Sequence, residues 1–140
     1  PEAYPEHLEA GTQNLVGIAA LNAGVQYVLS HQKAIMEKEY FLLQKLYEGL
    51  TGYVEFYSSL ENSTPIVAIN IPGKDSAYVS DLLNYKYGIV TRCGAHCAPL
   101  MHKHLKTEEQ GIVRLSVSFQ NTIEDIDCVI RAIQEISNDY

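Results

Sequence analysis

The run Ile66-Val67-Ala68-Ile69-Asn70-Ile71 gives the clearest indication of the fold. Most of its residues are β-branched, and such side chains favour a strand because they pack well on a pleated surface. The segments 62–65 and 72–75 on either side are rich in turn-forming residues, which bound the strand at both ends. We therefore predict a strand over residues 66–71.

Three further segments have the pattern of strands. Residues 111–119 alternate cleanly between apolar and polar side chains, which is typical of a half-buried strand. Residues 53–57 and the short run 87–91 show weaker versions of the same pattern. Together with residues 66–71, they predict a small sheet.

Three helices are predicted between and after these strands. The first can be capped by Asp75 or Ser76 and reaches about Tyr85, and the second is a short helix over residues 100–105. The third begins at Asn121-Thr122, and its apolar face consists of Ile126, Val129, Ile130, Ile133 and Ile136. This order predicts an α+β domain with a small, mostly antiparallel sheet flanked by helices.

The N-terminal part is predicted to be mainly helical. Residues 15–29 are small and apolar on most sides, a pattern typical of a buried helix. Thr12 or Asn14 can cap the start of this helix. We predict a kink or a break at residues 30–32, followed by a second helix with one apolar face that ends over residues 49–52.

The composition is that of one globular domain. The chain has 140 residues, 46% hydrophobic and 19% charged, which is enough to bury a core. Its formal net charge of −7 argues against a nucleic-acid partner, because phosphate binding needs a basic face. No run approaches the roughly 18 apolar residues of a membrane span, so no membrane partner is expected. The three cysteines form no disulfide framework, which favours a reducing, cytoplasmic compartment.

The segment Arg92-Cys93-Gly94-Ala95-His96-Cys97-Ala98-Pro99-Leu100-Met101-His102 concentrates the chemically reactive side chains. A glycine and a proline within it predict a turn, on which a thiol is readily exposed. A thiol reacts as its thiolate, which neighbouring cations favour, and Arg92 and His96 stand close to Cys97 in the sequence. A free cysteine is more often a small buried hydrophobe, so this pattern by itself leaves both interpretations open.

Metal binding is an alternative use of the same segment. Cys93, His96, Cys97, His102 and His104 are of residue types that bind zinc. Their spacing contains no C-x-x-C pair, and structural zinc sites usually use two separated pairs. We therefore predict no metal site, and we interpret Cys93 as a bystander.

Arg114 lies in the middle of the predicted strand over residues 111–119. The alternation places Arg114 on the face of Ile112 and Ser116, opposite three apolar side chains of that strand. One interpretation is a solvent-facing arginine on an edge strand. The other is a guanidinium fork directed at a carboxylate, for which arginine geometry is well suited.

Four motifs follow one another along the chain: Glu9-Ala10-Gly11-Thr12-x-Asn14, Arg92-x-Gly94-x-His96-Cys97-Ala98-Pro99-Leu100, Gly111-x-Val113-Arg114-x-Ser116 and Asn121-Thr122-x-Glu124-Asp125-Ile126-Asp127. Together they resemble the C-terminal part of the cysteine desulfurase and selenocysteine lyase family. That family belongs to the class V aminotransferases, which are pyridoxal-phosphate enzymes of fold type I. The resemblance covers nearly the whole chain.

The resemblance implies a role for each matching residue. Cys97 is expected to attack the sulfur of the substrate and Arg114 to bind its carboxylate, with Arg92 and His96 as further substrate-binding residues. The implied function is removal of sulfur from L-cysteine, or a similar small amino acid, to give alanine and a persulfide on Cys97. Two alternatives stay open: a transaminase, epimerase or selenocysteine lyase relative without sulfur transfer, and a standalone metal or binding module.

The resemblance also implies that this chain is the C-terminal part of a longer, homodimeric enzyme. Residues 1–30 would end the large cofactor domain and form the connecting helix, and residues 31–140 would form the C-terminal small domain. Thr12 is expected to reach the phosphate of pyridoxal phosphate in the partner subunit's site, and Asn14 to lie near the cofactor. The Schiff-base lysine would precede this chain, so the fragment alone is expected to be inactive. A sulfur-acceptor protein is the further expected partner.

Overall fold

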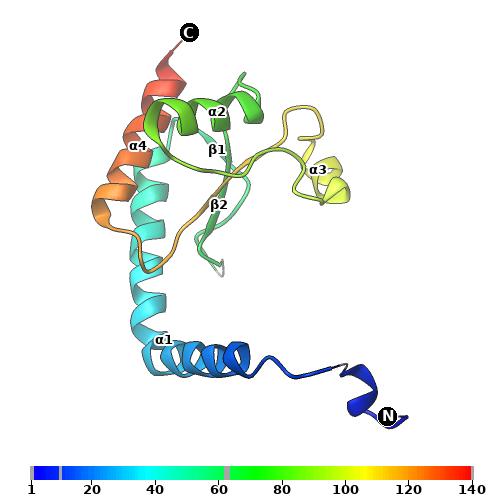
Figure 1. The fold of residues 1–140 in the computed structure, drawn as a ribbon. Coiled ribbons are helices and arrows are strands. Elements are labelled where there is room, and N and C mark those ends of the chain that lie inside the picture. The colour runs from blue at the N-terminus through cyan, green and yellow to red at the C-terminus, as the bar shows by residue number, and fades with distance from the viewer. Residues whose placement is uncertain (1, 10, 62–63, 140) are drawn as a thin grey trace. The chain divides into compact units, whose positions relative to one another are not determined.

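The computed structural model describes residues 2–9, 11–61 and 64–139. They form two compact units, one up to Ile35 and one from Met36 onward. In chain order the elements are η1 (Glu6–Leu8), α1 (Leu15–Leu50), β1 (Glu55–Phe56), β2 (Ile66–Asn70), α2 (Ser76–Tyr87), α3 (Pro99–Leu105), β3 (Val113–Ser116) and α4 (Ile123–Asn138) (Figure 1). Ala10 of the first motif and residues 62 and 63 of the predicted turn lie outside the described residues.

The second unit contains a three-stranded antiparallel sheet in the order β1-β2-β3. The predicted strand over residues 66–71 is its central strand, β2, in which Ile69 pairs with Phe56 on one side and with Val113 on the other. Its β-branched Val67 and Ile69 are completely buried. The predicted α+β class with a small antiparallel sheet is therefore confirmed.

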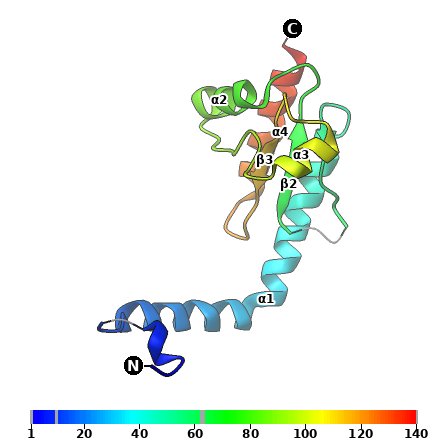
Figure 2. The same ribbon diagram turned by 90° about the vertical axis from the view of Figure 1, so that its right-hand side faces the viewer.

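Helices on one side of the sheet supply much of the core. Figures 1 and 2 show the part of α1 that belongs to the second unit, together with α4, on one side of the strands and α3 on the other side. An ion pair of 2.8 Å between Lys45 and Asp127 joins α1 to α4. The core consists of Leu42, Leu43, Leu46, Leu50, Val67, Ile69, Ile71, Val79, Leu83, Val113, Leu115, Val117, Ile126, Ala132, Ile133 and Ile136.

Side-chain caps fix the starts of α2 and α4. The Oδ1 atom of Asp75 accepts from the N–H groups of Ala77 at 2.9 Å and Tyr78 at 3.1 Å. Thr122 Oγ1 accepts from the N–H of Asp125 at 3.1 Å, and Asp125 Oδ2 accepts in return from the N–H of Thr122 at 3.0 Å. These contacts satisfy amides that lack a partner within the helix, and they confirm the predicted helix starts.

The predicted strand over residues 87–91 is wrong. Helix α2 continues through Tyr87 and ends at Gly88, whose left-handed backbone lets its N–H donate to the carbonyls of Leu83 and Asn84. A glycine in this position is a common helix terminator. The chain meets the sheet only afterwards, through an isolated bridge between Arg92 and Arg114.

Helix α1 runs without interruption from Leu15 to Leu50, so the predicted break at residues 30–32 is wrong, whereas a kink there stays a prediction. The Ser30 hydroxyl donates back to the carbonyls of Gln26 and Tyr27, which satisfies this polar group within the helix.

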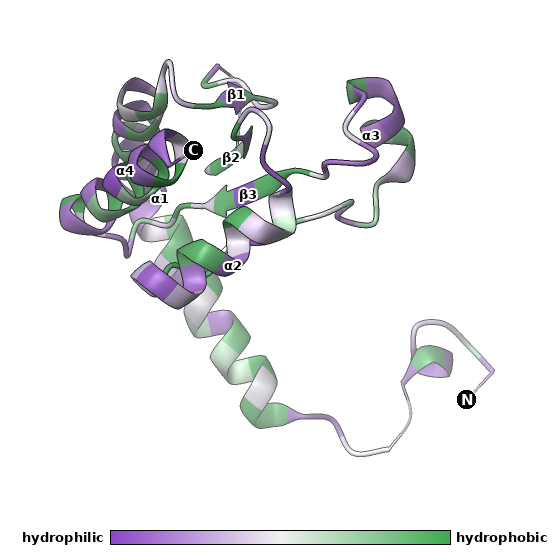
Figure 3. Cartoon of the chain, turned by 90° about the horizontal axis from the view of Figure 1, so that it is seen from above, coloured by the Kyte–Doolittle hydropathy of each residue, from purple (hydrophilic) through white to green (hydrophobic). Residues whose placement is uncertain are grey.

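Within the described residues nothing covers the apolar side chains of residues 15–29, so the burial of this helix stays a prediction. Leu15, Val16 and Leu21 are 72%, 82% and 68% exposed, and the first turns of α1 carry hydrophobic colouring in Figure 3. No helix within the described ranges combines the length and apolar character needed to cross a membrane.

Two glycines let the backbone before the Cys97 turn approach the start of β3. A Cβ atom at Gly111 would lie 2.9 Å from the Cα of Gly94 and against Ser76 Oγ. The carbonyl of Gly94 accepts from the N–H of Ile112 at 3.3 Å. The chain on both sides of the segment 94–111 is therefore held together at its base.

We expect Gly111→Ala to destabilise the chain more than Gly73→Ala. Both glycines have positive φ, +68° and +76°, but a Cβ at Gly73 would meet no atom within 4 Å. The shared backbone penalty is on the order of 1 kcal/mol, and the clash at Gly111 adds about 1–3 kcal/mol. Urea unfolding followed by circular dichroism measures the difference. Equal losses in the two variants would contradict the close approach of Gly94 and Gly111.

Candidate functional site

The backbones of Arg92 and Arg114 pair along the outer edge of β3. The N–H of Arg114 donates to the carbonyl of Arg92 at 2.7 Å, and the N–H of Arg92 donates to the carbonyl of Arg114 at 3.2 Å. Residues directly opposite each other in an antiparallel pair place their side chains on the same face of the sheet. This pairing therefore brings two predicted site residues, 22 positions apart in the sequence, to one place.

Cys97 lies on a tight turn between Ala95 and Ala98. The N–H of Ala98 donates to the carbonyl of Ala95 at 2.8 Å, and the two central residues, His96 and Cys97, have φ angles of 51° and 59°. Positive φ at both central positions is typical of a type I′ turn, and it costs each non-glycine residue about 1–2 kcal/mol. Cys97 is exposed at the corner of this turn, which excludes the interpretation of a buried structural cysteine.

Arg92 contacts both residues at the corner of the turn. One of its guanidinium nitrogens lies 4.0 Å from Cys97 Sγ. His96 Nε2 lies 3.1 Å from the Arg92 carbonyl oxygen. Since a carbonyl can only accept, this nitrogen carries the proton.

His96 is held in its neutral form. Burial is the main cause that lowers the pKa of His96, and the charges of Arg114 and Arg92 and the neighbouring His102 lower it further, against the hydrogen bond to the Arg92 carbonyl. A neutral imidazole whose Nε2 donates to Arg92 has an acceptor at Nδ1. The turn therefore carries an exposed thiol and a nitrogen that can take up a proton.

Arg114 has an unused donor. It is half-buried, and its neighbours along β3, Val113 and Leu115, are buried. Within the described residues, Arg114 Nε and Asn70 Oδ1 are the buried side-chain nitrogen and oxygen atoms without a hydrogen-bond partner. A buried donor without a partner is costly, and an anion such as a carboxylate would satisfy it.

The sequence suggested His102 only as one of several possible zinc ligands, and it gave no indication of Thr107; both residues lie behind the turn. His102 Nδ1 lies 2.9 Å from Thr107 Oγ1, and both residues are almost completely buried. The sequence offers no periodic signal for them, because α3 has only seven residues. Among the described residues, no group of three or more His, Cys, Asp or Glu is placed to hold a metal ion.

Thr12 and Asn14 belong to the N-terminal unit. Thr12 is exposed. The Oδ1 atom of Asn14 accepts from the N–H of Gly17 at 2.9 Å, so Asn14 supplies the predicted cap of α1. The role of both residues at a cofactor stays a prediction.

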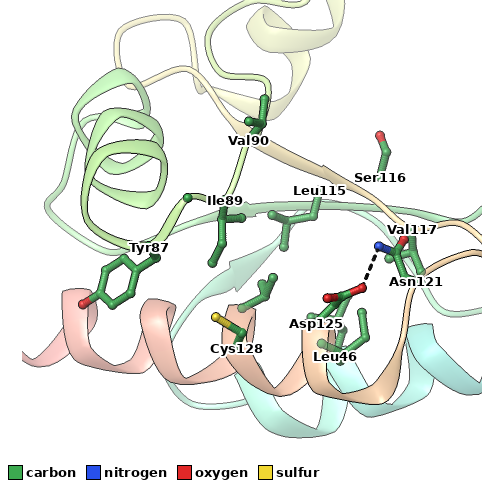
Figure 4. A pocket seen from close by; sticks show the side chains of 13 residues that line it. Leu46, Tyr87, Ile89, Val90, Leu115, Ser116, Val117, Asn121, Asp125 and Cys128 are labelled. Carbon is green, nitrogen blue, oxygen red and sulfur yellow. Dashed lines mark hydrogen bonds between the residues drawn. The ribbon is translucent and has the colours of Figure 1, made fainter.

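A cavity of about 360 Å³ lies on the same unit, lined by β3, the start of α4 and the residues that follow α2. Figure 4 shows Val90 and Ser116 on its rim and Cys128 and Asp125 on its α4 side. None of the sequence-predicted site residues lines this cavity. The reactive groups gather instead on the turn at Cys97.

The sequence matches the Aminotransferase class-V family over residues 2–129. A probable cysteine desulfurase of Methanothermobacter thermautotrophicus is 31% identical, over 97% of this chain and 35% of that protein. A cysteine desulfurase of Escherichia coli is 32% identical, over 94% of this chain and 32% of that protein. The chain thus spans about a third of the length of these curated relatives.

Solved structures of cysteine desulfurases have the same fold. The apo structure of the enzyme from Thermococcus onnurineus superposes with a TM-score of 0.84 at 31% identity, over 95% of this chain and 34% of that chain. A cysteine desulfurase of Escherichia coli gives a TM-score of 0.80 at 24% identity, over 96% of this chain and 33% of that chain. On the family match and the shared fold, the chain belongs to the class-V aminotransferase family.

Proposed function

We propose that this chain is the C-terminal part of a pyridoxal-phosphate-dependent cysteine desulfurase, which moves sulfur from L-cysteine onto Cys97. The observation that supports this most strongly is the arrangement of Arg92, His96 and Cys97 on one turn against the edge strand that carries Arg114. An exposed thiol, a neutral imidazole and an arginine with a free donor are the groups that sulfur transfer from an amino acid needs.

Arg114 binds the carboxylate of the substrate in this proposal. Its Nε is buried without a partner, so a carboxylate oxygen would gain a charge-assisted hydrogen bond at no cost of displacing another protein partner. Arg92 is held to Arg114 through the backbone and adds positive charge beside Cys97. The substrate is thereby oriented relative to the thiol.

Cys97 accepts the sulfur. The Cys97 thiolate attacks the sulfur of the bound cysteine, an S–S bond forms, and the Cβ–S bond of the substrate breaks. The electron pair of that bond stays with the substrate carbon, which becomes alanine after it gains a proton, and Cys97 keeps a persulfide. His96, neutral and with Nδ1 as an acceptor, can take the proton of the Cys97 thiol before this attack.

Pyridoxal phosphate supplies the electron sink that makes the Cβ–S bond of the substrate breakable. We propose that Thr12, whose side chain is exposed, binds its phosphate in the partner subunit's site and that Asn14 lies beside it. The Schiff-base lysine is proposed to lie outside this chain. The complete enzyme is accordingly proposed to be a homodimer that passes its persulfide to a sulfur-acceptor protein.

We expect Cys97→Ala to abolish release of alanine and sulfide from L-cysteine by the complete enzyme. Cys93→Ala and Cys128→Ala are the matched controls, because both thiols are free but less exposed than Cys97. They should retain activity and persulfide formation, measured by alanine release and by mass spectrometry of the Cys97 peptide. Unchanged turnover in Cys97→Ala would exclude the proposed sulfur transfer and favour another class V reaction.

Arg114→Lys should raise KM for L-cysteine by about 10-fold or more. A lysine keeps the charge but loses the planar fork, and a hydrogen bond to a charged group is worth about 1.5–3 kcal/mol. Arg131→Lys, an exposed arginine of α4, serves as the control. Steady-state kinetics with L-cysteine make the comparison, and an unchanged KM in Arg114→Lys would rule out carboxylate binding by Arg114.

His96→Asn should reduce the loss of folding stability that occurs as the pH falls. Burial lowers the pKa of His96 in the folded chain, so the unfolded chain binds the proton more tightly. Above about pH 6.5 the residue is neutral in both states, and stability is lost as pH falls towards and through the lowered pKa. Asparagine tolerates positive φ but does not titrate.

The fall in Tm between about pH 7.5 and pH 5.5 measures this contribution. It should be smaller in His96→Asn than in the unmodified chain, whereas the exposed His104→Asn should leave it unchanged. The same fall in all three proteins would show that His96 contributes nothing to the pH dependence.

A further inference from the structure

Three consecutive residues of α3 have the opposite of the usual burial. Leu100 and Met101 are 82% and 56% exposed, while His102 is only 3% exposed. Burial of an imidazole is unfavourable unless its nitrogens are paired. A buried histidine on a helix that begins two residues after Cys97 therefore indicates a specific task, and the sulfur-transfer steps above do not use it.

His102 is paired with Thr107 through both side chain and backbone. Its Nδ1 lies 2.9 Å from Thr107 Oγ1, and the N–H of Thr107 donates to the His102 carbonyl at 2.9 Å. The Thr107 carbonyl in turn accepts from the N–H of Gly111 at 2.8 Å. This chain of contacts connects the end of α3 to the base of β3.

On its other side, His102 contacts both residues that flank Cys97. Its backbone N–H donates to the Ala98 carbonyl at 3.2 Å. Its ring meets the ring of His96 edge-on, with centroids 5.9 Å apart and an interplanar angle of 68°. His102 thus bridges the turn at Cys97 and the anchored Thr107.

Such a bridge is needed because the turn is strained. Two consecutive residues, His96 and Cys97, have left-handed backbones, and such conformations persist only where the surroundings determine them. Without support, the turn would relax and Cys97 would leave Arg92, whose guanidinium lies 4.0 Å from Cys97 Sγ.

We propose that His102, anchored by Thr107, is a positioning residue that holds the turn 95–98 in its left-handed form and so fixes the direction of the Cys97 thiol. It acts through His96 and Ala98 and does not touch the substrate. The proposal rests on the proposed function only in taking Cys97 as the nucleophile.

The test compares Thr107→Val, which removes the hydroxyl at nearly constant shape, with Thr107→Ser, which keeps it. His102→Gln removes the ring, and His104→Gln is the matched control because His104 is an exposed histidine of the same helix. The measurement is the rate of Cys97 alkylation by iodoacetamide relative to that of Cys93 in the same molecule, followed by peptide mass mapping of folded protein.

We expect Thr107→Val and His102→Gln to lower the Cys97-to-Cys93 rate ratio about threefold or more, with Thr107→Ser and His104→Gln unchanged. In the complete enzyme, Thr107→Val and His102→Gln should lower kcat for persulfide formation and leave KM for L-cysteine unchanged. If Thr107→Val does not fold, His102→Gln against His104→Gln decides the question.

A loss of thermal stability in Thr107→Val or His102→Gln, with an unchanged rate ratio, would overturn the proposal and reduce the pair to a structural role. Failure of the proposed function has a different signature. In that case Cys97→Ala would leave turnover intact in the complete enzyme, whatever the alkylation ratios are.

Discussion

The backbone pairing between Arg92 and Arg114 is the constraint on which the candidate site depends. Its two hydrogen bonds, of 2.7 and 3.2 Å, join an irregular segment to the outer edge of β3. β3 is itself fixed by its ladder to the buried central strand. The pairing therefore fixes an irregular segment of the backbone to the core. It also places the guanidinium of Arg92 beside Cys97.

A tight base supports the strained turn beyond this pairing. Gly94 and Gly111 approach each other so closely that a side chain at Gly111 would collide with the backbone. Between them, α3 turns Leu100 and Met101 outward and His102 inward. Leu100 and Met101 are thus exposed, and the hydrogen-bonded pair of His102 and Thr107 is buried in their place, behind the turn at Cys97.

Besides the buried Oδ1 of Asn70, two features of the described chain are left without a partner. The buried Nε of Arg114 has no hydrogen-bond partner, and the apolar side chains over residues 15–29 are exposed. Unpaired buried donors and contiguous exposed apolar surface are both unfavourable in water. An anion would satisfy the first. The second agrees with a chain that spans about a third of the length of its relatives.

The sequence by itself predicted the α+β class, the strand over residues 66–71 and the caps of α2 and α4, because hydrophobic periodicity and cap chemistry are local signals. The resemblance of its motifs added Cys97, Arg92, His96 and Arg114 as site candidates. The error at residues 87–91 was a local one, because the helix cap at Gly88 is a signal that the sequence itself carries. Tertiary structure alone decided that Arg92 lies opposite Arg114 and that His102 is buried behind His96. Contacts between residues far apart in the sequence leave no periodic trace, so only the fold reveals them.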